Sequence, residues 1–367
     1  MKKSRILFVV ILVACMAMSM VACKTETPAE APAQAPAETP AATETPAAPE
    51  SGGGIKMGFI IPFASHEWYA NTQKGAQMTA DELGYELIVT DCRNDQDTQI
   101  SQGQAMLAQQ VDVLIMAPVD GDGVMPLIDE ARDQGIPVVT HAVVAQWQDI
   151  FVGTPDWDAG VALGVKAGEY ALEKGLDTPN CLLVGLPALP SCVDRSEGFK
   201  EGMLSVIPEA TFIDVDGGGN KDTAMPAASD ALTGNPNVNT IMGINDDSTL
   251  GGVQAYDALG YDMGNLIAWG FGCEGIAAKN EMSNPDSPYK GSLAMFPEYY
   301  GRMTVLAARD ILDGIEHTNE WLKLPVEVMT IDNLSGFYTQ EGDSWNILWP
   351  NIEALGFDYR PLAEALH

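Results

Sequence analysis

Short apolar runs alternate with longer amphipathic stretches along most of the chain. Several of the runs are apolar throughout rather than at every second position, which is typical of parallel strands covered on both faces. The runs lie at 55–63, 85–90, 111–117, 136–140, 181–185, 211–215, 240–244, 266–271 and 290–296. Each is followed by a polar turn, so nine strands are predicted.

The stretches between the runs predict helices, because their apolar residues recur on one stripe and several stretches end at a glycine. Gly84, Gly175, Gly260 and Gly314 follow four of them as stop signals. At the amino ends, Asp97 is expected to cap one helix, and Asp246 with Asp247 another. The predicted helices span 68–83, 97–110, 124–134, 158–174, 191–206, 246–259 and 299–312.

Regular alternation of strand and helix predicts a doubly wound α/β fold with right-handed crossovers. Two parallel sheets fit this many strands better than one, and the rhythm breaks near 153–158. Ligands of open α/β sheets bind beyond the carboxyl ends of the strands. The residues directly after each apolar run are therefore the candidates for function.

The amino terminus reads as an export signal. A basic head precedes the apolar stretch 6–22, which ends in a small residue before Cys23. This order resembles a bacterial lipobox and predicts a signal peptide over 1–22 and lipidation of Cys23. Two alternatives remain: a plain signal peptide, or a lipobox ending at Cys15, which would leave the apolar residues 16–21 on the mature chain.

Residues 23–54 predict a lipid-anchored linker without fixed structure. They are mostly Ala, Pro, Thr and Glu and close with a glycine run, so they have little apolar surface to bury. The folded part is expected to begin near Ile55. The protein is therefore predicted to be exported and held at the outer face of the cell membrane, or in a periplasm.

The charge of the chain restricts its partners. It carries 51 acidic and 19 basic residues, a formal net charge of −32. A surface this acidic repels phosphate backbones and anionic lipids, so neither nucleic acid nor membrane contact beyond the lipid anchor is expected. Residues 55–367 are long enough for two domains.

The sequence carries no enzyme or metal signature. GxSxG, HExxH and Walker patterns are absent, and the glycine run at 217–219 lacks dinucleotide-binding spacing. No CxxC pair is present, and Cys181 with Cys192 is left as a possible disulfide. The aspartates at 91, 95 and 97 lack the glycine and glutamate of a calcium loop. We therefore predict no enzymatic activity, no cofactor and no metal.

Six groups of loop motifs follow one another along the chain in a recognisable order. They are Gly58-Phe59-Ile60-Ile61 with His66-Glu67-Trp68-Tyr69 and Lys74-Gly75-Ala76, Asp112 to Pro118, Gly135 to Thr140, Arg195-Ser196-Glu197-Gly198-Phe199, Ile244-Asn245-Asp246-Asp247, and Trp269-Gly270-Phe271-Gly272. Taken together, these motifs resemble the type I periplasmic sugar-binding proteins, and the resemblance runs from about 55 to 328.

The resemblance implies two doubly wound lobes joined by three hinge crossings, near Asp156, Met295 and Glu327. The first lobe would comprise 55–156 and 296–327, and the second 157–295 with 328–367. Trp345 and Trp349, beyond the short form of the fold, are expected to pack onto the folded body. A monomer is implied that binds one small sugar, polyol or similar molecule and passes it to the permease of an ABC importer.

In the first lobe the resemblance implies an aromatic contact with the ligand. Trp68 and Tyr69 occupy positions where the family places rings against a sugar, whose apolar face suits a flat ring. Both could instead pack against the core. His66 stands where relatives carry an amide, and an imidazole can also donate and accept hydrogen bonds. The alternative for His66 is an exposed loop histidine.

In the second lobe the resemblance implies two polar ligand contacts. Arg195 matches the family's ligand-binding arginine, whose fork suits neighbouring hydroxyls or a carboxylate. The alternative is a surface ion pair with Asp194 or Glu197. Asn245 matches an asparagine at a strand end that both donates and accepts.

Three positions depart from the family's pattern. His141 and Ala142 replace an Asp-Arg pair, Cys273 and Glu274 follow Gly272 where an aspartate is usual, and Met295 replaces a hinge glutamine. Only His141 and Glu274 could replace the lost polar contacts. Unpaired hydroxyls cost about 1–3 kcal/mol each, which disfavours an ordinary hexose. A deoxysugar, pentose, polyol, furanone signal or purine would fit better.

Binding is expected to proceed by hinge closure, with Trp68 and Tyr69 binding first and Arg195 and Asn245 completing the site. Arg195→Ala is expected to weaken binding while leaving the melting temperature of the unliganded protein little changed. A sensor that passes its occupancy to a membrane receptor kinase would have the same fold and pocket. That alternative, like a nucleoside or furanone ligand, stays open.

Overall fold

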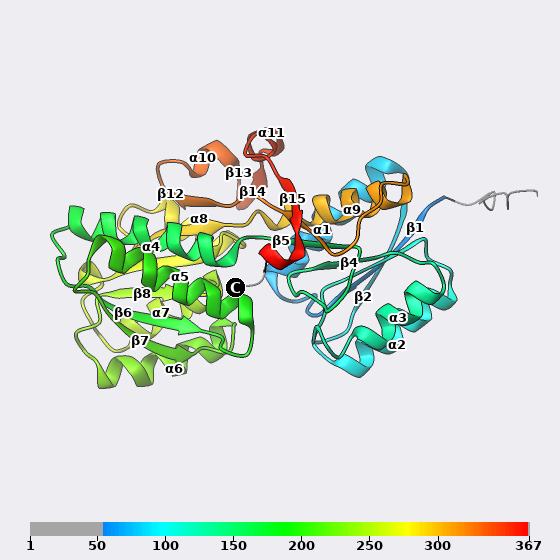
Figure 1. Cartoon of the computed structure of the whole chain (residues 1–367). Coiled ribbons are helices and arrows are strands. Elements are labelled where there is room, and N and C mark those ends of the chain that lie inside the picture. The colour runs from blue at the N-terminus through cyan, green and yellow to red at the C-terminus, as the bar shows by residue number, and fades with distance from the viewer. Residues whose placement is uncertain (1–53, 366–367) are drawn as a thin grey trace, which may run out of the picture. The chain divides into compact units, whose positions relative to one another are not determined.

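The structure, a computed structural model, describes residues 54–365 and contains two mainly parallel sheets flanked by helices (Figure 1). The predicted two-sheet α/β architecture is confirmed. The predicted signal peptide, the lipidated Cys23 and all but the last residue of the predicted linker lie outside the described residues.

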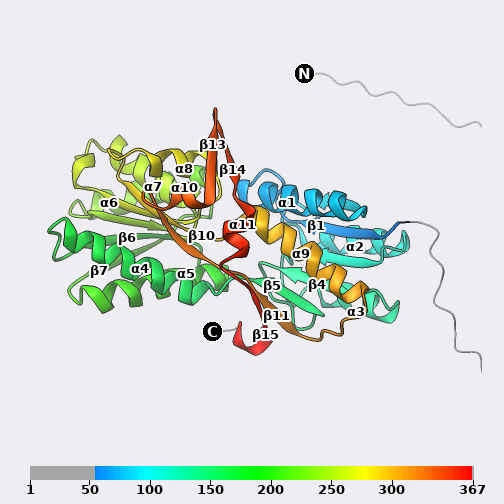
Figure 2. The same cartoon turned by 90° about the horizontal axis from the view of Figure 1, so that it is seen from above.

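The first sheet has seven strands, and its helices pack as two pairs, α1 with α9 (Figure 2) and α2 with α3 (Figure 1). The order of strands is β15-β11-β5-β4-β3-β1-β2, and only the β11–β15 pair is antiparallel. The strands are β1 (Lys56–Ile61), β2 (Glu86–Asp91), β3 (Val113–Met116), β4 (Val138–His141), β5 (Ile150–Gly153), β11 (Glu320–Lys323) and β15 (Asp358–Pro361); the helices are α1 (Glu67–Leu83), α2 (Gln96–Ala108), α3 (Met125–Asp133) and α9 (Pro297–Leu312).

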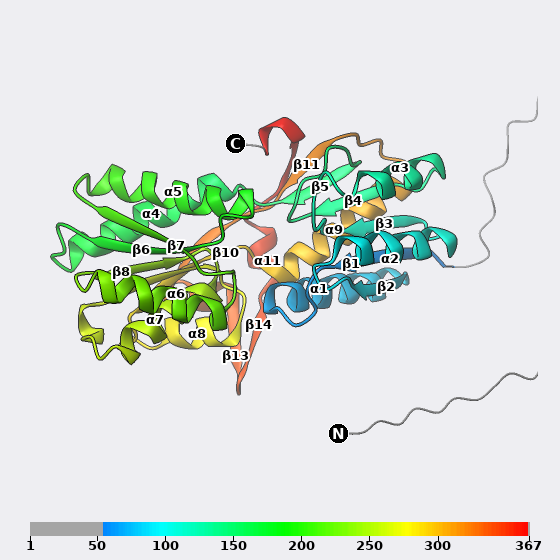
Figure 3. The same ribbon diagram turned by 90° about the horizontal axis from the view of Figure 1, so that it is seen from below.

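The second sheet has six strands in the order β12-β10-β9-β8-β6-β7, with only β10–β12 antiparallel. Helices α4 and α5 lie on one side of it, and α6 and α7 on the other (Figure 3). The strands are β6 (Asn180–Gly185), β7 (Thr211–Asp216), β8 (Thr240–Gly243), β9 (Ile267–Gly272), β10 (Tyr289–Ala294) and β12 (Glu327–Thr330); the helices are α4 (Asp156–Glu173), α5 (Pro190–Val206), α6 (Lys221–Gly234), α7 (Asp246–Ala258) and α8 (Ile276–Ser283), with a 3₁₀ turn at Met263–Asn265.

The central strands are apolar because both faces are buried. All four residues of β3 have no exposed surface, and neither do Phe59 in β1 and Trp269 in β9. Such strands read as continuous apolar runs, which is why the sequence located them.

The chain passes between the sheets at the three predicted positions. It leaves the first sheet after β5, returns between β10 and α9, and leaves again between β11 and β12. Asp156 begins α4, Met295 follows β10, and Glu327 begins β12. The predicted three-crossing connection is therefore confirmed.

The carboxyl-terminal residues add a further connection. A hairpin of β13 (Tyr338–Glu341) and β14 (Ser344–Ile347) follows α10 (Leu334–Phe337); α11 (Trp349–Glu353), β15 and a 3₁₀ turn at Leu362–Glu364 come after it. Trp345 donates to Asn280 Oδ1 of α8 at 2.9 Å, and the Trp349 ring lies 6.4 Å from Tyr299 of α9. Both tryptophans therefore pack onto the folded body, as predicted.

The structure differs from the predicted assignment of 328–367 to the second lobe. β12 does join the second sheet, but β15 pairs antiparallel with β11 and so extends the first. The Tyr359 hydroxyl donates to Asp310 Oδ2 at 3.1 Å, and its ring stacks on His317 at 4.8 Å. These contacts join segments about 50 residues apart, which local patterns do not reveal.

Helices α1 and α9 approach so closely that glycine is required at the contact. A Cβ on Gly75 would overlap the backbone carbonyl of Glu298, and one on Gly301 would overlap that of Thr72. The obstacle in each case is backbone, which cannot rotate away as a side chain can.

Gly75→Ala is expected to lower the free energy of unfolding by about 2 kcal/mol, because the added methyl must push α1 and α9 apart. Urea denaturation measures the change. Gly234→Ala is the matched control, since a Cβ there meets no atom within 4 Å. The control is expected to be neutral or stabilising by up to about 1 kcal/mol. Equal stability of the two variants would contradict the close contact.

Candidate functional site

His66 caps the first helix and reaches the second lobe. Its Nδ1 accepts a hydrogen bond from the backbone N–H of Trp68 at 3.2 Å, which makes it the N-cap of α1. This bond turns Nε2 outward, 3.5 Å from Nδ2 of Asn245. Burial lowers the pKa of His66, so the ring stays neutral. The side chain is thus held in place where the two lobes meet.

The two aromatic residues that follow have different surroundings. Trp68 is buried and packs edge-on against Tyr300 at 5.1 Å, in agreement with the alternative of a core position. The Tyr69 ring lies 6.5 Å from His141. Burial raises the pKa of Tyr69, and the nearby guanidinium of Arg195 opposes that shift. Tyr69 is therefore the aromatic residue that shares its surroundings with second-lobe groups.

His141 ends β4 as a fully buried side chain, and neither of its ring nitrogens has a hydrogen-bond partner within residues 54–365. Its ring contacts are aromatic, to Phe59 at 5.3 Å and Tyr300 at 6.0 Å. Burial lowers its pKa to about 3. A neutral imidazole has one donor and one acceptor, and a buried polar group without a partner is costly. His141 therefore has hydrogen-bonding capacity that a ligand could use.

His141 is expected to make stability depend on pH. Its folded pKa lies below 6.5, so the unfolded chain binds the proton and stability falls as the pH drops below 6.5. From pH 7 to pH 5 the loss is about 2 kcal/mol. His141→Gln removes this contribution but leaves the buried carboxyls in place. Urea denaturation at both pH values is expected to show a smaller loss in the variant, and an equal loss would contradict the assignment.

Arg195, in α5, contacts Asp156 at the first crossing and the residue directly after β8. Its Nε donates to Asp156 Oδ1 at 2.7 Å, and its Nη1 donates to the carbonyl of Ile244 at 3.0 Å. The guanidinium also lies over the ring of Phe271, 4.7 Å from its centroid. Arg195 thus pairs with Asp156, a partner that the sequence alternatives, Asp194 and Glu197, did not include. Burial raises the pKa of Asp156, and Arg195 counteracts this.

Asp156 is a residue that sequence reasoning placed at the hinge but not in the site. A signal was present, since an acidic residue directly follows the break in the strand–helix rhythm. Met295, at the second crossing, lies beside the same group. Its sulfur is 3.6 Å from Nη2 of Arg195 and 3.5 Å from the Thr154 hydroxyl. The structure therefore brings Asp156, Arg195 and Met295 together.

Asn245, and not Asp246, caps α7. Its Oδ1 accepts from the N–H of Ser248 at 2.8 Å, and its Nδ2 donates to the carbonyl of Gly219 at 2.7 Å. The predicted caps at Asp246 and Asp247 are therefore wrong, because the chain turns into the helix one residue earlier. The prediction for Asp97 is wrong for the same reason: Asp95 caps α2, accepting from Thr98.

Asp246 instead holds the buried polar groups of the second lobe together. Its Oδ1 accepts from the hydroxyls of Tyr289 at 2.5 Å and Ser292 at 2.7 Å. Its Oδ2 accepts from the N–H of Glu274 at 2.7 Å. Three donors on one carboxylate fix the backbone at Glu274.

Glu274 is buried between the lobes. Its carboxylate lies 3.9 Å from Nδ1 of His66, and its carbonyl accepts from Nδ2 of Asn71 at 2.8 Å. Burial, with the neighbouring Asp246 carboxylate, raises its pKa well above the usual value, and Arg195 opposes the shift. Glu274 thus keeps its proton to a higher pH than an ordinary glutamate, and it interacts electrostatically with Tyr69 and Arg195.

The described residues show no sign of a metal or a disulfide. Cys92, Cys181, Cys192 and Cys273 are buried free thiols, so the possible Cys181–Cys192 pair is not formed. Among residues 54–365 no group of three or more His, Cys, Asp or Glu side chains could hold a metal ion. Within the same range, every helix is too short or too polar to span a bilayer.

Comparison with known proteins identifies the family. Residues 57–316 match the periplasmic binding protein domain. The chain belongs to this family. Its members are extracytoplasmic binding proteins, which agrees with the prediction of no enzymatic activity.

Individual relatives are distant but cover most of their own length. This periplasmic binding protein is 25% identical over 291 residues to the ribose import binding protein of Bacillus subtilis, covering 77% of this chain and 91% of the relative. Its fold is similar to that of an ABC transporter solute-binding protein from Mycobacterium smegmatis with bound glycerol (TM-score 0.71, 23% identity, 79% and 98% of the chains). A solute-binding protein from Actinobacillus succinogenes with bound D-allose is also similar (TM-score 0.70, 19% identity, 77% and 100%).

Proposed function

We propose that this periplasmic binding protein captures a small sugar or sugar-like molecule between its lobes and delivers it to an ABC importer. The observation that carries the proposal is that side chains of both lobes meet at His66. The Tyr69 ring lies 6.1 Å from the ring of His66 and 6.5 Å from that of His141, and the Glu274 carboxylate of the second lobe lies 3.9 Å from Nδ1 of His66. The charge of Arg195 acts on both Tyr69 and Glu274. These groups offer a ring face, unused hydrogen-bonding capacity and a fixed charge. Relatives described as ribose import binding proteins support a sugar.

The proposed mechanism is closure around the hinge at Asp156 and Met295. A ligand held by Tyr69 and His141 would recruit Arg195 and Glu274, so that it binds the closed form more tightly than the open form. His66, Trp68, Asn245 and Met295 act in this proposal as supports: they cap helices, pack the first lobe or line the hinge.

A thermal-shift screen tests the ligand class. D-ribose, D-allose, L-arabinose, myo-inositol and glycerol are compared with adenosine as the nucleoside alternative. A ligand present at 100 times its dissociation constant stabilises the folded state by about 2.7 kcal/mol, which raises the melting temperature by several degrees. A shift with adenosine alone would overturn the sugar assignment.

We propose further that Cys23 is lipidated and anchors the exported monomer at the membrane. Mass spectrometry of the mature protein is expected to find an amino-terminal peptide that begins at Cys23 and carries acyl chains. Cys23→Ala should release the protein from the membrane fraction. An unmodified amino terminus at any other residue would contradict the anchor.

A further inference from the structure

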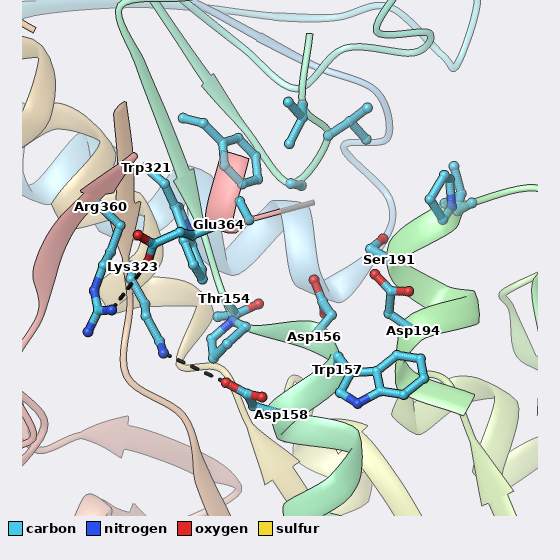
Figure 4. A pocket seen from close by; sticks show the side chains of 18 residues that line it. Thr154, Asp156, Trp157, Asp158, Ser191, Asp194, Trp321, Lys323, Arg360 and Glu364 are labelled. Carbon is cyan, nitrogen blue, oxygen red and sulfur yellow. Dashed lines mark hydrogen bonds and ion pairs between the residues drawn. The ribbon is translucent and has the colours of Figure 1, made fainter. Parts of the chain in front are cut away.

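A cavity of about 340 Å³ is lined in part by Asp156 (Figure 4), the residue that forms an ion pair with Arg195. Its size falls within the range of small-molecule sites. Its wall is formed by the loop 142–144 after β4, Phe151 of β5, the crossing 154–158, the start of α5 at 189–194, and a carboxyl-terminal wall from β11, β15 and the turn after it. We call this space the hinge cavity.

The hinge cavity adjoins the candidate ligand site at two places. Asp156 lines the cavity while its Oδ1 accepts from Arg195. Ala142, also in the lining, directly follows His141, whose ring nitrogens have no partner among the described residues. A ligand that used His141 and Arg195 would thus end next to this space.

The lining has the chemistry that recognises a neutral sugar ring. Trp157 and Trp321 stand at different sides of the cavity (Figure 4), and an indole face suits the apolar face of a sugar. Four carboxylates, of Asp156, Asp158, Asp194 and Glu364, can accept hydrogen bonds from hydroxyls. The two cations in the lining pair with acidic residues, Lys323 with Asp158 at 3.8 Å and Arg360 with Glu364 at 3.3 Å. The excess of acidic groups disfavours phosphorylated or carboxylated ligands.

Part of the carboxyl-terminal wall lies beyond the segment that resembles the family. Trp321 and Lys323 belong to β11, which precedes the third crossing, whereas Arg360 and Glu364 follow both the family match, which ends at residue 316, and the resemblance, which ends near residue 328. The pairing of β11 with β15 brings these residues together. Because Arg360 and Glu364 line the cavity, this protein can offer a ligand contacts that the shared part of the fold does not supply.

We propose that the hinge cavity is a second subsite, which binds the distal ring of a neutral two-ring glycoside whose first ring occupies the site between the lobes. This inference rests on the proposed function and narrows its ligand class. Both lobes contribute to the cavity wall, through residues 142–144 and 189–194, so the distal ring favours the closed form.

Isothermal titration of the mature protein with matched pairs of sugars tests the proposal. D-xylose is compared with xylobiose, and L-arabinose with arabinobiose, because the site between the lobes is expected to disfavour an ordinary hexose. At least one disaccharide is expected to bind ten times or more as tightly as its monosaccharide. If monosaccharides bind and no disaccharide binds more tightly, the second subsite is wrong while the proposed function stands. If ribose, allose and all members of these pairs fail to bind, both proposals are overturned.

Variants locate the distal ring. Trp157→Ala is expected to weaken disaccharide binding at least tenfold and to change monosaccharide binding less than twofold. Trp345→Ala, in the β13–β14 hairpin, is the matched control and should change neither. Asp158→Asn serves as a second variant should Trp157→Ala misfold by circular dichroism, and it is expected to act in the same direction. Equal losses for both sugars in either cavity variant would overturn the subsite.

Discussion

Arg195→Ala is expected to weaken ligand binding about 100-fold. The charge of Arg195 acts on both Tyr69 and Glu274, and a hydrogen bond from a charged group to a ligand is worth about 1.5–3 kcal/mol. Isothermal titration with the ligand found by thermal shift measures the loss. Arg302→Ala is the matched control, because Arg302 forms its ion pair with Glu82 at the surface.

The same variant is also expected to melt at a lower temperature without ligand, in contrast to the expectation from sequence alone. The structure pairs Arg195 with a carboxylate whose side chain is only 16% exposed, so its removal leaves Asp156 unpaired. Arg195→Ala combined with Asp156→Asn should recover part of the melting temperature but not the binding. Recovery of both would show that Arg195 acts only by holding Asp156.

Asp246→Ala is expected to lower the free energy of unfolding by about 3 kcal/mol or more. Three buried donors, from Tyr289, Ser292 and Glu274, lose their acceptor, and each unsatisfied group costs about 1–3 kcal/mol. Differential scanning calorimetry should show a melting temperature lower by about 6 °C or more.

Asp247→Ala is the control for this experiment, because Asp247 lies next to Asp246 in the first turn of α7 but is partly exposed. It is expected to cost less than about 1 kcal/mol. Similar melting temperatures for the two variants would show that the Asp246 network contributes little. Asp246→Asn should fall between them, since its amide can accept from Tyr289 but cannot also accept on its nitrogen from Glu274.

The helix N-caps show that the sequence located the start of a helix to within one or two residues but did not identify the side chain that caps it. The sequence places an acidic cap at Asp97 and another at Asp246, and in the structure each cap lies one or two residues earlier, at Asp95 and Asn245. Several neighbouring side chains can cap a helix, so the choice depends on where the backbone leaves the preceding strand.

The sequence by itself determined the two-sheet architecture, because a strand buried on both faces must be apolar throughout, and it directed attention to the loops after the strands, which meet at one edge of a parallel sheet. The three crossings and the residues proposed for the site came from the resemblance of the loop motifs to the type I sugar-binding proteins. The strands therefore follow from local pattern, whereas the crossings and the site residues follow from that resemblance.

Only the tertiary structure decided which side chains pair. Arg195 bonds Asp156, 39 positions away, Asp246 bonds groups 28 to 46 positions away, and β15 returns to β11. These contacts bury charged side chains and pair β15 with β11. The sequence pattern of each segment does not show which distant residue will be its partner. Which side chains pair depends on which of them folding brings close together in space. The pairs formed in this way make up both the candidate ligand site and the wall of the hinge cavity.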